Sequence, residues 1–260
     1  TINITNQDFK WTTTLLGSTN KNELVDFGGA SGLISNVDDK RAAEWINLQG
    51  QPISSFYGFV VDREIPEEFI VDPYRLVGAQ AQDVYVKDLN GDGVIDDDDK
   101  TIIGDPYPEL IWSIANDFRY KNIDFSFTFQ GSYGGQVRNM TDQYIFNHFN
   151  SSQDFNQNTT PDQGFIREKI FTDAIIQDAS YVALRTVSLG YTLDTSIVEK
   201  LGVRKTRVYA TAQNLFFATA DGYTGWNPEA IRDEGVLNEG YQRGGSPVAR
   251  TISLGLNVEF

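Results

Sequence analysis

The sequence has no cysteine, a single histidine and fewer basic than acidic residues, and each shortage excludes a class of function. Without cysteine there is no disulfide framework, no thiolate metal site and no cysteine nucleophile. One histidine gives almost no support for a zinc site or a Ser-His-Asp triad, so we expect no catalytic residues and no enzyme. The formal net charge of −15 lacks the basic footprint that nucleic-acid binding requires.

Long hydrophobic runs are also missing, because no apolar stretch approaches the roughly 20 residues of a membrane-spanning helix. A search for such helices does not detect membrane β-barrels, whose strands carry a weaker signal. The 23 glycines and 13% aromatic residues favour strands and tight turns within one large or two smaller domains. Because the chain starts at Thr1 without a signal peptide, we interpret it as a piece of a longer polypeptide.

The clearest pattern is in the last stretch, residues 250–260, where apolar side chains alternate strictly with small or polar ones. Alternation of this kind indicates a strand with one apolar and one polar face. Its apolar residues are Ile252, Leu254, Leu256, Val258 and Phe260. In an outer-membrane barrel these side chains would face lipid, whereas in a soluble sandwich they would face the core. The terminal strand alone leaves both folds open.

Similar patterns predict six long strands, at 8–16, 110–120, 123–133, 180–193, 206–217 and 250–260. The connections between them alternate between long and short, at roughly ninety, two, fifty, twelve and thirty residues, as in outer-membrane barrels with short periplasmic turns and long extracellular loops. Aromatic residues at both ends of the strands resemble the girdles at two membrane interfaces. These residues are Phe118, Tyr120, Tyr191 and Phe260 at the short turns, and Trp112, Tyr133, Tyr181, Phe216 and Phe217 at the long loops. The pattern favours a barrel over a sandwich.

One residue conflicts with this pattern. Arg185 falls in the same alternation as the apolar Val187 and Leu189. Either a β-bulge shifts the phase of the strand, or this end of the strand lies beyond the lipid.

Residues 83–100 contain a loop with the ligand spacing of a calcium site. The candidate ligands are Asp88, Asn90, Asp92, Val94 through its carbonyl, Asp96 and Asp99. Alternate residues in a tight turn bring several oxygen atoms around one point, as calcium requires. Asp99 replaces the usual glutamate, and the flanking helices of an EF-hand are missing. We expect structural calcium, with a solvated acidic turn as the alternative.

Three aromatic residues of the last long loop, Tyr223, Trp226 and Tyr241, are candidates for stacking on a sugar or peptide. The alternative is that they pack the loop against itself, which is the commoner role of such residues.

Seven stretches of the chain follow one another in the order found in a known family. They are residues 84–95, 103–108, 120–127, 180–191, 212–216, 227–229 and 250–260. On these stretches the chain resembles the C-terminal region of SusC/RagA-type outer-membrane proteins. Ala183-Leu-Arg replaces the more usual Phe-Leu-Arg, and Trp226-Asn stands where Tyr-Asp is commoner.

The resemblance implies an all-β fold, in which residues 1–260 form the C-terminal strands of a large antiparallel transmembrane β-barrel with long extracellular loops. It implies a TonB-dependent importer of oligosaccharides or peptides in the outer membrane of Bacteroidetes. The partners would be outer-membrane lipid, a SusD-like surface lipoprotein that acts as a lid, and the TonB system through an N-terminal segment and plug outside this chain. Phe260 would be read by the barrel-assembly machinery. The alternatives are a SusC-like structural subunit without transport activity and a soluble calcium-binding β-sandwich.

Overall fold

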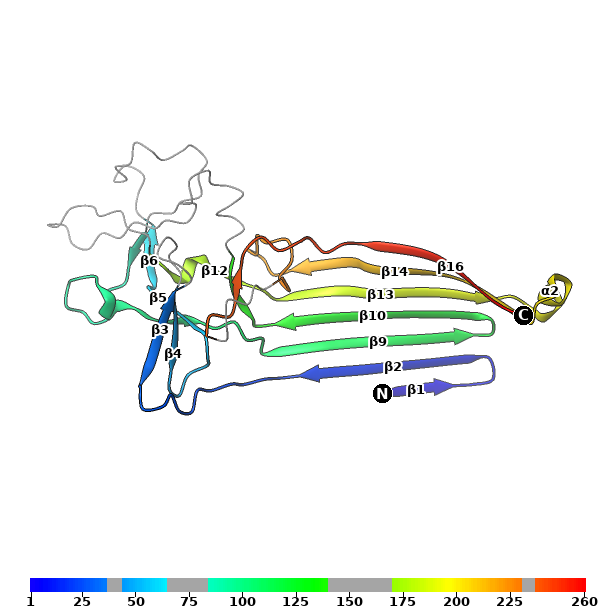
Figure 1. Ribbon diagram of the computed structural model, residues 1–260, viewed down its shortest axis with the longest axis horizontal. Coiled ribbons are helices and arrows are strands. Elements are labelled where there is room, and N and C mark those ends of the chain that lie inside the picture. Colours follow the sequence, from blue (N-terminus) through cyan, green and yellow to red (C-terminus); the bar gives the residue numbers. More distant parts are fainter. Residues whose placement is uncertain (37–43, 65–83, 140–169, 231–236) are drawn as a thin grey trace, which may run out of the picture.

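The protein consists of one long antiparallel sheet, joined at one end to a cluster of smaller sheets, as the computed structural model shows (Figure 1). The structure describes residues 1–36, 44–64, 84–139, 170–230 and 237–260. The long sheet, called the wall below, has seven strands in the order β1-β2-β9-β10-β13-β14-β16. Since β1 and β16 form its two edges, the wall does not close on itself within these residues.

The wall strands are β1 (Ile2–Thr5), β2 (Phe9–Ser18), β9 (Leu110–Tyr120), β10 (Ile123–Tyr133), β13 (Tyr181–Thr192), β14 (Lys205–Thr219) and β16 (Thr251–Glu259). β9, β10 and β13 have 11, 11 and 12 residues, close to the ~9–11 that a tilted barrel strand needs to cross a bilayer. The sequence patterns missed β1, because four residues are too few to show a period of two.

Adjacent rows of residues across the wall alternate between apolar and polar. One row crosses all seven strands through Ile4, Trp11, Phe118, Phe125, Leu189, Ala210 and Leu254. The next row contains only polar residues, namely Asn3, Thr12, Asp117, Ser126, Ser188, Thr211 and Ser253. The register therefore gives the wall one apolar face and one polar face.

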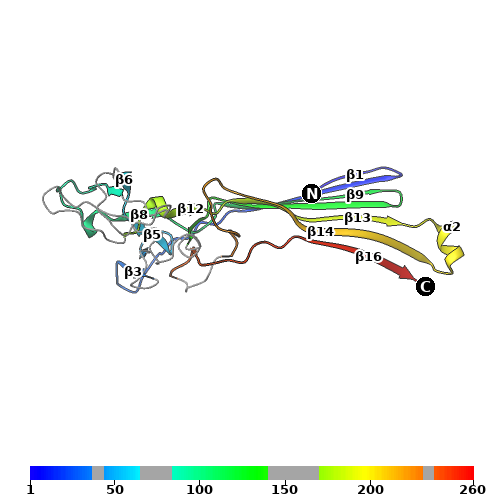
Figure 2. The same ribbon diagram turned by 90° about the horizontal axis from the view of Figure 1, so that it is seen from above.

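The apolar face has no protein cover. Leu254 is 84% exposed and Ile252 is 69% exposed, and large apolar residues of the other wall strands are exposed as well. In a β-sandwich these side chains would be buried by a second sheet. Figures 1 and 2 instead show the described smaller sheets beyond the ends of the wall strands. The described residues thus form no sandwich, and an apolar face of this kind suits contact with lipid.

Connections of different length gather at opposite ends of the wall. The short turns at residues 6–8, 121–122 and 193–204 lie at one end, where the C-terminus also lies (Figure 1). The third turn contains helix α2 (Thr195–Val198) and the 3-10 helix η4 (Glu199–Leu201). Within the described ranges, no helix is long and apolar enough to cross a membrane.

The long connections form the loop cluster, which has three small sheets. These are β3 (Gly32–Asn36), β4 (Glu44–Leu48), β5 (Ser55–Gly58) and β8 (Thr101–Gly104); β6 (Val61–Glu64) and β7 (Val84–Val86); and β12 (Ile176–Asp178), β11 (Gln136–Asn139) and β15 (Tyr241–Gln242). Two further 3-10 helices are η2 (Asp97–Asp99) and η3 (Asp173–Ile175). Trp45, Phe56 and Tyr241 are fully buried in the main core of this cluster. The loop cluster thus has its own hydrophobic core.

Two glycines of the wall make room for large side chains on the polar face. Tyr209 pairs with Gly190 on one side and with Gly255 on the other. A Cβ atom at Gly255 would overlap the Tyr209 ring, and one at Gly190 would overlap Arg207 and Asp124. Glycine at position 255 thus leaves room for the Tyr209 ring, and at position 190 a larger residue would displace the Arg207–Asp124 pair.

Candidate functional site

The site that joins the wall to the loop cluster is built around a bulge at Arg185. The pairing of β10 with β13 shifts between Thr128 and Phe129, and the pairing of β13 with β14 shifts between Leu184 and Thr186. Arg185 is thereby left out of both ladders and lies on the polar face. Of the two explanations for Arg185, the structure shows the bulge.

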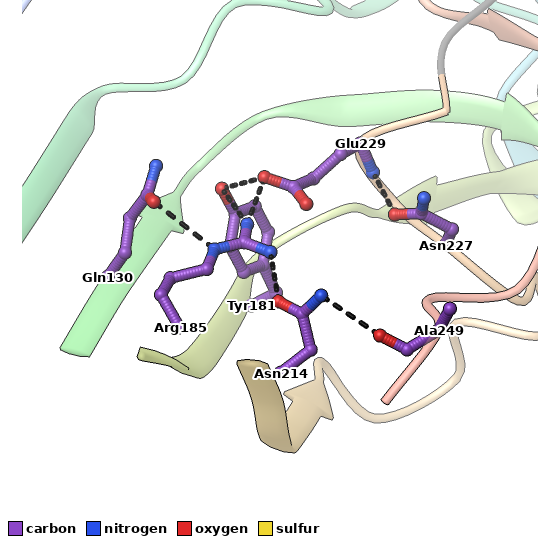
Figure 3. A network of polar contacts seen from close by, with 7 residues as sticks. All are labelled: Gln130, Tyr181, Arg185, Asn214, Asn227, Glu229 and Ala249. Atoms are coloured by element: carbon purple, nitrogen blue, oxygen red, sulfur yellow. Dashed lines mark hydrogen bonds and ion pairs between the residues drawn. The ribbon is translucent and has the colours of Figure 1, made fainter. Parts of the chain in front are cut away.

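Arg185 forms a network with side chains from three other segments (Figure 3). It pairs with Glu229 of the last long loop, whose carboxylate also accepts a 2.6 Å hydrogen bond from the Tyr181 hydroxyl. Its Nε donates to Gln130 Oε1 and its Nη1 to Asn214 Oδ1, both at 3.2 Å. The planar guanidinium suits such a role, because its donors point in several fixed directions.

Aromatic rings hold the guanidinium in place. The rings of Tyr181 and Phe217 stack with centroids 5.2 Å apart, and Arg185 lies 5.5 and 5.6 Å from the two centroids. Such contacts between a cation and ring faces are attractive. Tyr181 and Phe217 are therefore on the polar face, and their assignment to a membrane girdle is corrected. For Tyr181 the cause is the bulge, which reverses the alternation of β13 beyond it. Phe217 keeps the alternation of β14 and stands opposite Ala183 on the polar face.

The segment around Glu229 is also tied to the loop cluster. Gln242 of β15 donates through Nε2 to the Asn227 carbonyl at 2.5 Å and accepts from the Tyr223 hydroxyl at 2.5 Å. Residues 223–229 thus bridge the wall and the loop cluster, and we call the group Tyr181, Arg185 and Glu229 the clamp. The clamp was not predicted from the sequence, although an arginine in an apolar alternation was a signal for it.

The three aromatic candidates for substrate binding occupy different environments. Tyr241 is fully buried in the core, and Tyr223 is 9% exposed with its hydroxyl bonded to Gln242. Both rings therefore pack within the loop cluster, in line with the alternative role. Trp226 is 54% exposed and is the one of the three whose ring is accessible.

The calcium-type loop folds around the backbone amides of its own turn. Asp88 accepts from the amides of Gly91 at 2.6 Å and Gly93 at 2.8 Å. Asp99 is fully buried and accepts from the amides of Leu89 at 2.7 Å and Asp96 at 3.0 Å. Gly91 and Gly93 have φ of 77° and 84°, which favours glycine at both positions.

The remaining ligand candidates have similar contacts. Asn90 Oδ1 accepts from the Asp92 amide, Asp92 from the Val94 amide and Asp96 from the Asp98 amide, at 2.8, 2.8 and 2.9 Å. Among the residues that the structure describes, no three His, Cys, Asp or Glu side chains are gathered closely enough to hold a metal ion. The donor types and turn geometry fit calcium, and calcium binding stays a prediction.

Lys100 connects this loop to the core of the loop cluster. Its Nζ lies 2.9 Å from Glu44 Oε2 on β4, 2.9 Å from Asp97 Oδ1 and 5.5 Å from the centre of the Phe59 ring. Burial lowers the pKa of Lys100, but the hydrogen bonds to Glu44 and Asp97 outweigh burial, and the net pKa is raised. Lys100 therefore stays charged and holds the end of the loop.

Phe260 follows β16 at the short-turn end of the wall and is 83% exposed. No described part of the protein covers this ring.

Comparison with known proteins gives relatives across the whole chain. No family model matches. TonB-dependent receptor P3 of Formosa agariphila is 33% identical over 99% of this chain, and the match covers 27% of the length of P3. TonB-dependent receptor P26 of the same organism is 30% identical over 100% of this chain, and the match covers 28% of the length of P26. TonB-dependent receptor SusC of Bacteroides thetaiotaomicron is 28% identical over 70% of the chain and 18% of its own length. The chain thus spans about a quarter of the curated relatives P3 and P26.

Solved structures show the same fold. The RagAB peptide transporter matches 99% of the chain with a TM-score of 0.68 and 18% identity, and the chain covers 28% of the transporter chain. The RagAB peptide importer in its open-open state matches with a TM-score of 0.66 and 18% identity, over 99% of this chain and 27% of the importer chain. The predicted fold class is confirmed: the wall is part of a large antiparallel transmembrane β-barrel.

Proposed function

We propose that this chain, a homologue of SusC/RagA-type TonB-dependent receptors, forms part of the barrel and extracellular loops of an importer in the bacterial outer membrane. The observation that carries this proposal is the exposed apolar face of the wall, with connections sorted by length at its two ends. Lipid would cover the apolar face, and the polar face would line the lumen. The short turns would then be periplasmic, and the loop cluster extracellular.

The proposed cargo is an oligosaccharide or a peptide, and the proposed partner is a SusD-like lipoprotein that covers the extracellular mouth. The RagAB structures are those of a peptide importer, which favours peptide. Oligosaccharide is kept as the second cargo class because the sequence resemblance to SusC/RagA-type proteins implies either one. Trp226 is the residue of this chain that we propose for cargo contact, because its ring is exposed in the segment 223–229 that carries Glu229. No residue of the described chain is proposed to perform covalent chemistry.

Import is tested with the complete receptor in its host. Strains with and without the receptor gene are grown on oligosaccharides and on peptides as sole nutrients, and uptake is measured with and without a working TonB system. The expected result is loss of growth on one cargo class in both deletions. Unchanged growth, with the receptor present and assembled in the membrane, would favour the alternative of a SusC-like structural subunit.

We also propose that the loop at residues 88–99 binds structural calcium. Titration calorimetry of the purified receptor is expected to show calcium-dependent heat that Asp88→Ala abolishes. Asp98→Ala is the matched control, because this neighbouring carboxylate does not occupy a ligand position. Absence of heat in the unsubstituted receptor, or an equal loss in both variants, would leave the loop as an acidic turn.

Phe260 is proposed as the residue that the barrel-assembly machinery recognises. Its deletion is expected to reduce the amount of receptor in the outer membrane far more than Glu259→Gln, since the neutral substitution leaves the aromatic end intact. Equal amounts of the two variants in isolated membranes would contradict this role.

A further inference from the structure

A lysine without an ion partner lies at the short-turn end of the wall. Lys121 opens the two-residue turn between β9 and β10, and its backbone has φ of 49°, a conformation that is uncommon for residues other than glycine. Its amide donates to the Asp8 carbonyl at 3.0 Å, which ties this turn to the one at residues 6–8. Lys121 is exposed and forms no salt bridge with any residue that the structure describes. A strained backbone at an unpaired charge points to a role in binding.

The ammonium group of Lys121 lies beside the apolar face. Its Nζ is 5.5 Å from the centre of the Tyr120 ring, an attractive contact between a cation and a ring. Tyr120 pairs with Ile123 of β10, and Ile123 pairs with Tyr191 of β13, so these three side chains form one row of the apolar face. All three are exposed. The cation therefore stands at one end of a surface that the proposed function assigns to lipid.

A carboxylate stands at the other end of this row. Asp194 accepts from the Tyr191 hydroxyl at 3.4 Å and from Asn122 Nδ2. It is exposed and, like Lys121, forms no salt bridge within the described part of the chain. The two ends of the row belong to β9 and β13, which are two strand spacings apart, about 10 Å at ~4.8 Å per spacing. The row thus has a cation at one end, a carboxylate at the other and an exposed apolar side chain between them.

We infer that this row binds the headgroup of one phospholipid, with the phosphate at Lys121 and a primary amine at Asp194. The inference rests on the proposed function, which places the apolar face in lipid and the short turns at the periplasmic surface. Tyrosine rings and lysine are typical of the membrane–water interface, where lipid phosphates lie. A headgroup with phosphate alone leaves Asp194 without a cation, and a quaternary ammonium offers it no N–H donor. The acyl chains would cover Ile123 and, further into the membrane, Phe125.

The experiment uses native mass spectrometry of the complete receptor, purified in detergent and titrated with three lipids of equal acyl chains. Phosphatidylethanolamine carries phosphate and a primary amine, phosphatidylglycerol carries phosphate without an amine, and phosphatidylcholine carries a quaternary ammonium. Phosphatidylethanolamine is expected to bind at least several-fold more tightly than either of the others. Soluble glycerophosphoethanolamine, which has the same headgroup without acyl chains, is expected not to displace it.

Variants of the row test the two contacts separately. Lys121→Asn removes the charge and keeps a residue that tolerates positive φ, so the turn is retained. It is expected to weaken phosphatidylethanolamine binding about tenfold, through loss of a charge-assisted hydrogen bond, and Lys121→Arg is expected to restore it. Asp194→Asn is expected to reduce phosphatidylethanolamine binding to the level of phosphatidylglycerol. The matched controls are Lys200→Asn in η4 and Asp8→Asn, which make the same charge changes at the short turns but outside the row.

The outcomes separate this inference from the proposed function. Equal binding of the three lipids, or equal losses in the row variants and their controls, would overturn the headgroup site. Displacement by glycerophosphoethanolamine at the same concentration would overturn it as well, because the site would then bind a soluble phosphate ester. A receptor that imports cargo without preference among the lipids keeps the proposed function and loses this site. Failure of import would instead appear as unchanged growth of the deletion strain, whatever lipid is bound.

Discussion

The wall and the loop cluster place their large apolar residues in opposite environments. In the wall, Leu254 and Ile252 are 84% and 69% exposed, while in the loop cluster Trp45 and Phe56 are fully buried. Exposed apolar side chains such as those of the wall are unfavourable in water, whereas the buried ones of the loop cluster are what folding in water produces. The same chain thus has one region that requires lipid and another that folds around its own core.

The difference also shows how the two regions are stabilised. In the wall, neighbouring strands pair over long ladders, such as the unbroken ones of β9 with β10 and with β2, so backbone hydrogen bonds are satisfied within the sheet, as lipid requires. In the loop cluster the strands have only two to five residues, and buried side chains connect segments far apart in sequence. Trp45, for example, donates to the Glu239 carbonyl at 2.8 Å. Substitutions that are harmless in one region should therefore be damaging in the other.

The largest effect is expected in the core of the loop cluster. Trp45→Ala removes a fully buried ring and should lower the free energy of unfolding of the cluster by about 3–5 kcal/mol. Hydrogen exchange of the β4 and β5 amides measures this loss. Val25→Ala is the control, because Val25 is 75% exposed and its truncation leaves no cavity. Equal exchange in the two variants would show that the cluster has no cooperative core.

A somewhat smaller effect is expected on the lipid-facing side of the wall. Leu254→Arg places a charge in the middle of β16 on the apolar face and should cost about 2–4 kcal/mol in a bilayer. Ser253→Arg, one residue away on the polar face, should cost less than about 1 kcal/mol. Denaturant titration of the receptor in lipid vesicles compares the two. Equal costs would contradict the assignment of the two faces.

The clamp joins the two regions, so its loss should weaken the attachment of the segment 223–229 to the wall. Glu229→Gln removes the charge that pairs with Arg185, at an expected cost of about 1.5–3 kcal/mol. Arg185→Lys keeps the charge but loses the simultaneous contacts to Gln130 and Asn214, and should give an intermediate effect. Protease cleavage of the loop at residues 220–230 reports the change. If cleavage is the same in both variants and the unsubstituted receptor, the clamp does not hold this loop.

The smallest effect, absent at neutral pH, concerns Tyr107 in the loop cluster. Burial and then the charge of Glu239 raise the pKa of Tyr107 to about 12 from the ordinary value of 10.0. Because an unfolded chain ionises this phenol first, its contribution to stability is complete below pH 10 and decreases as the pH rises toward 12. An absorbance titration of the phenolate, compared between the unsubstituted receptor and Tyr107→Phe, measures this pKa. A value near 10 would show that the residue is in contact with water.

Much of the wall could be predicted from single segments of sequence. The alternation in residues 123–130 and 250–260 depends only on the strand period, so the apolar and polar residues could be sorted without a partner strand. The two faces became certain only through the register, which aligns Leu254 with Ala210 and, through the next strand, with Leu189. The short β1 was missed because four residues show no clear period. Tyr181 was misassigned because a bulge reverses the alternation of β13. Phe217 was misassigned because it was grouped with its neighbour Phe216, although adjacent residues of β14 lie on opposite faces.

The loop cluster and the clamp could not be predicted in this way. Tyr241 lies about two hundred residues from Trp45, yet their rings are 6.1 Å apart in one core. Tyr223 and Tyr241 looked like candidates for binding because sequence alone gives the residue type and not its burial. Local periodicity carries no information on such distant contacts, since they depend on which loops fold over the same end of the wall.

The amino-acid sequence by itself determined the strand alternation, the sorting of long and short connections and the calcium-type spacing of residues 88–99, because each depends on neighbours in the chain. Only the tertiary structure decided which face Arg185 occupies, that Glu229 meets it and that Asp194 meets Asn122. These relations depend on strand register, and register is set by bulges and by packing between distant segments.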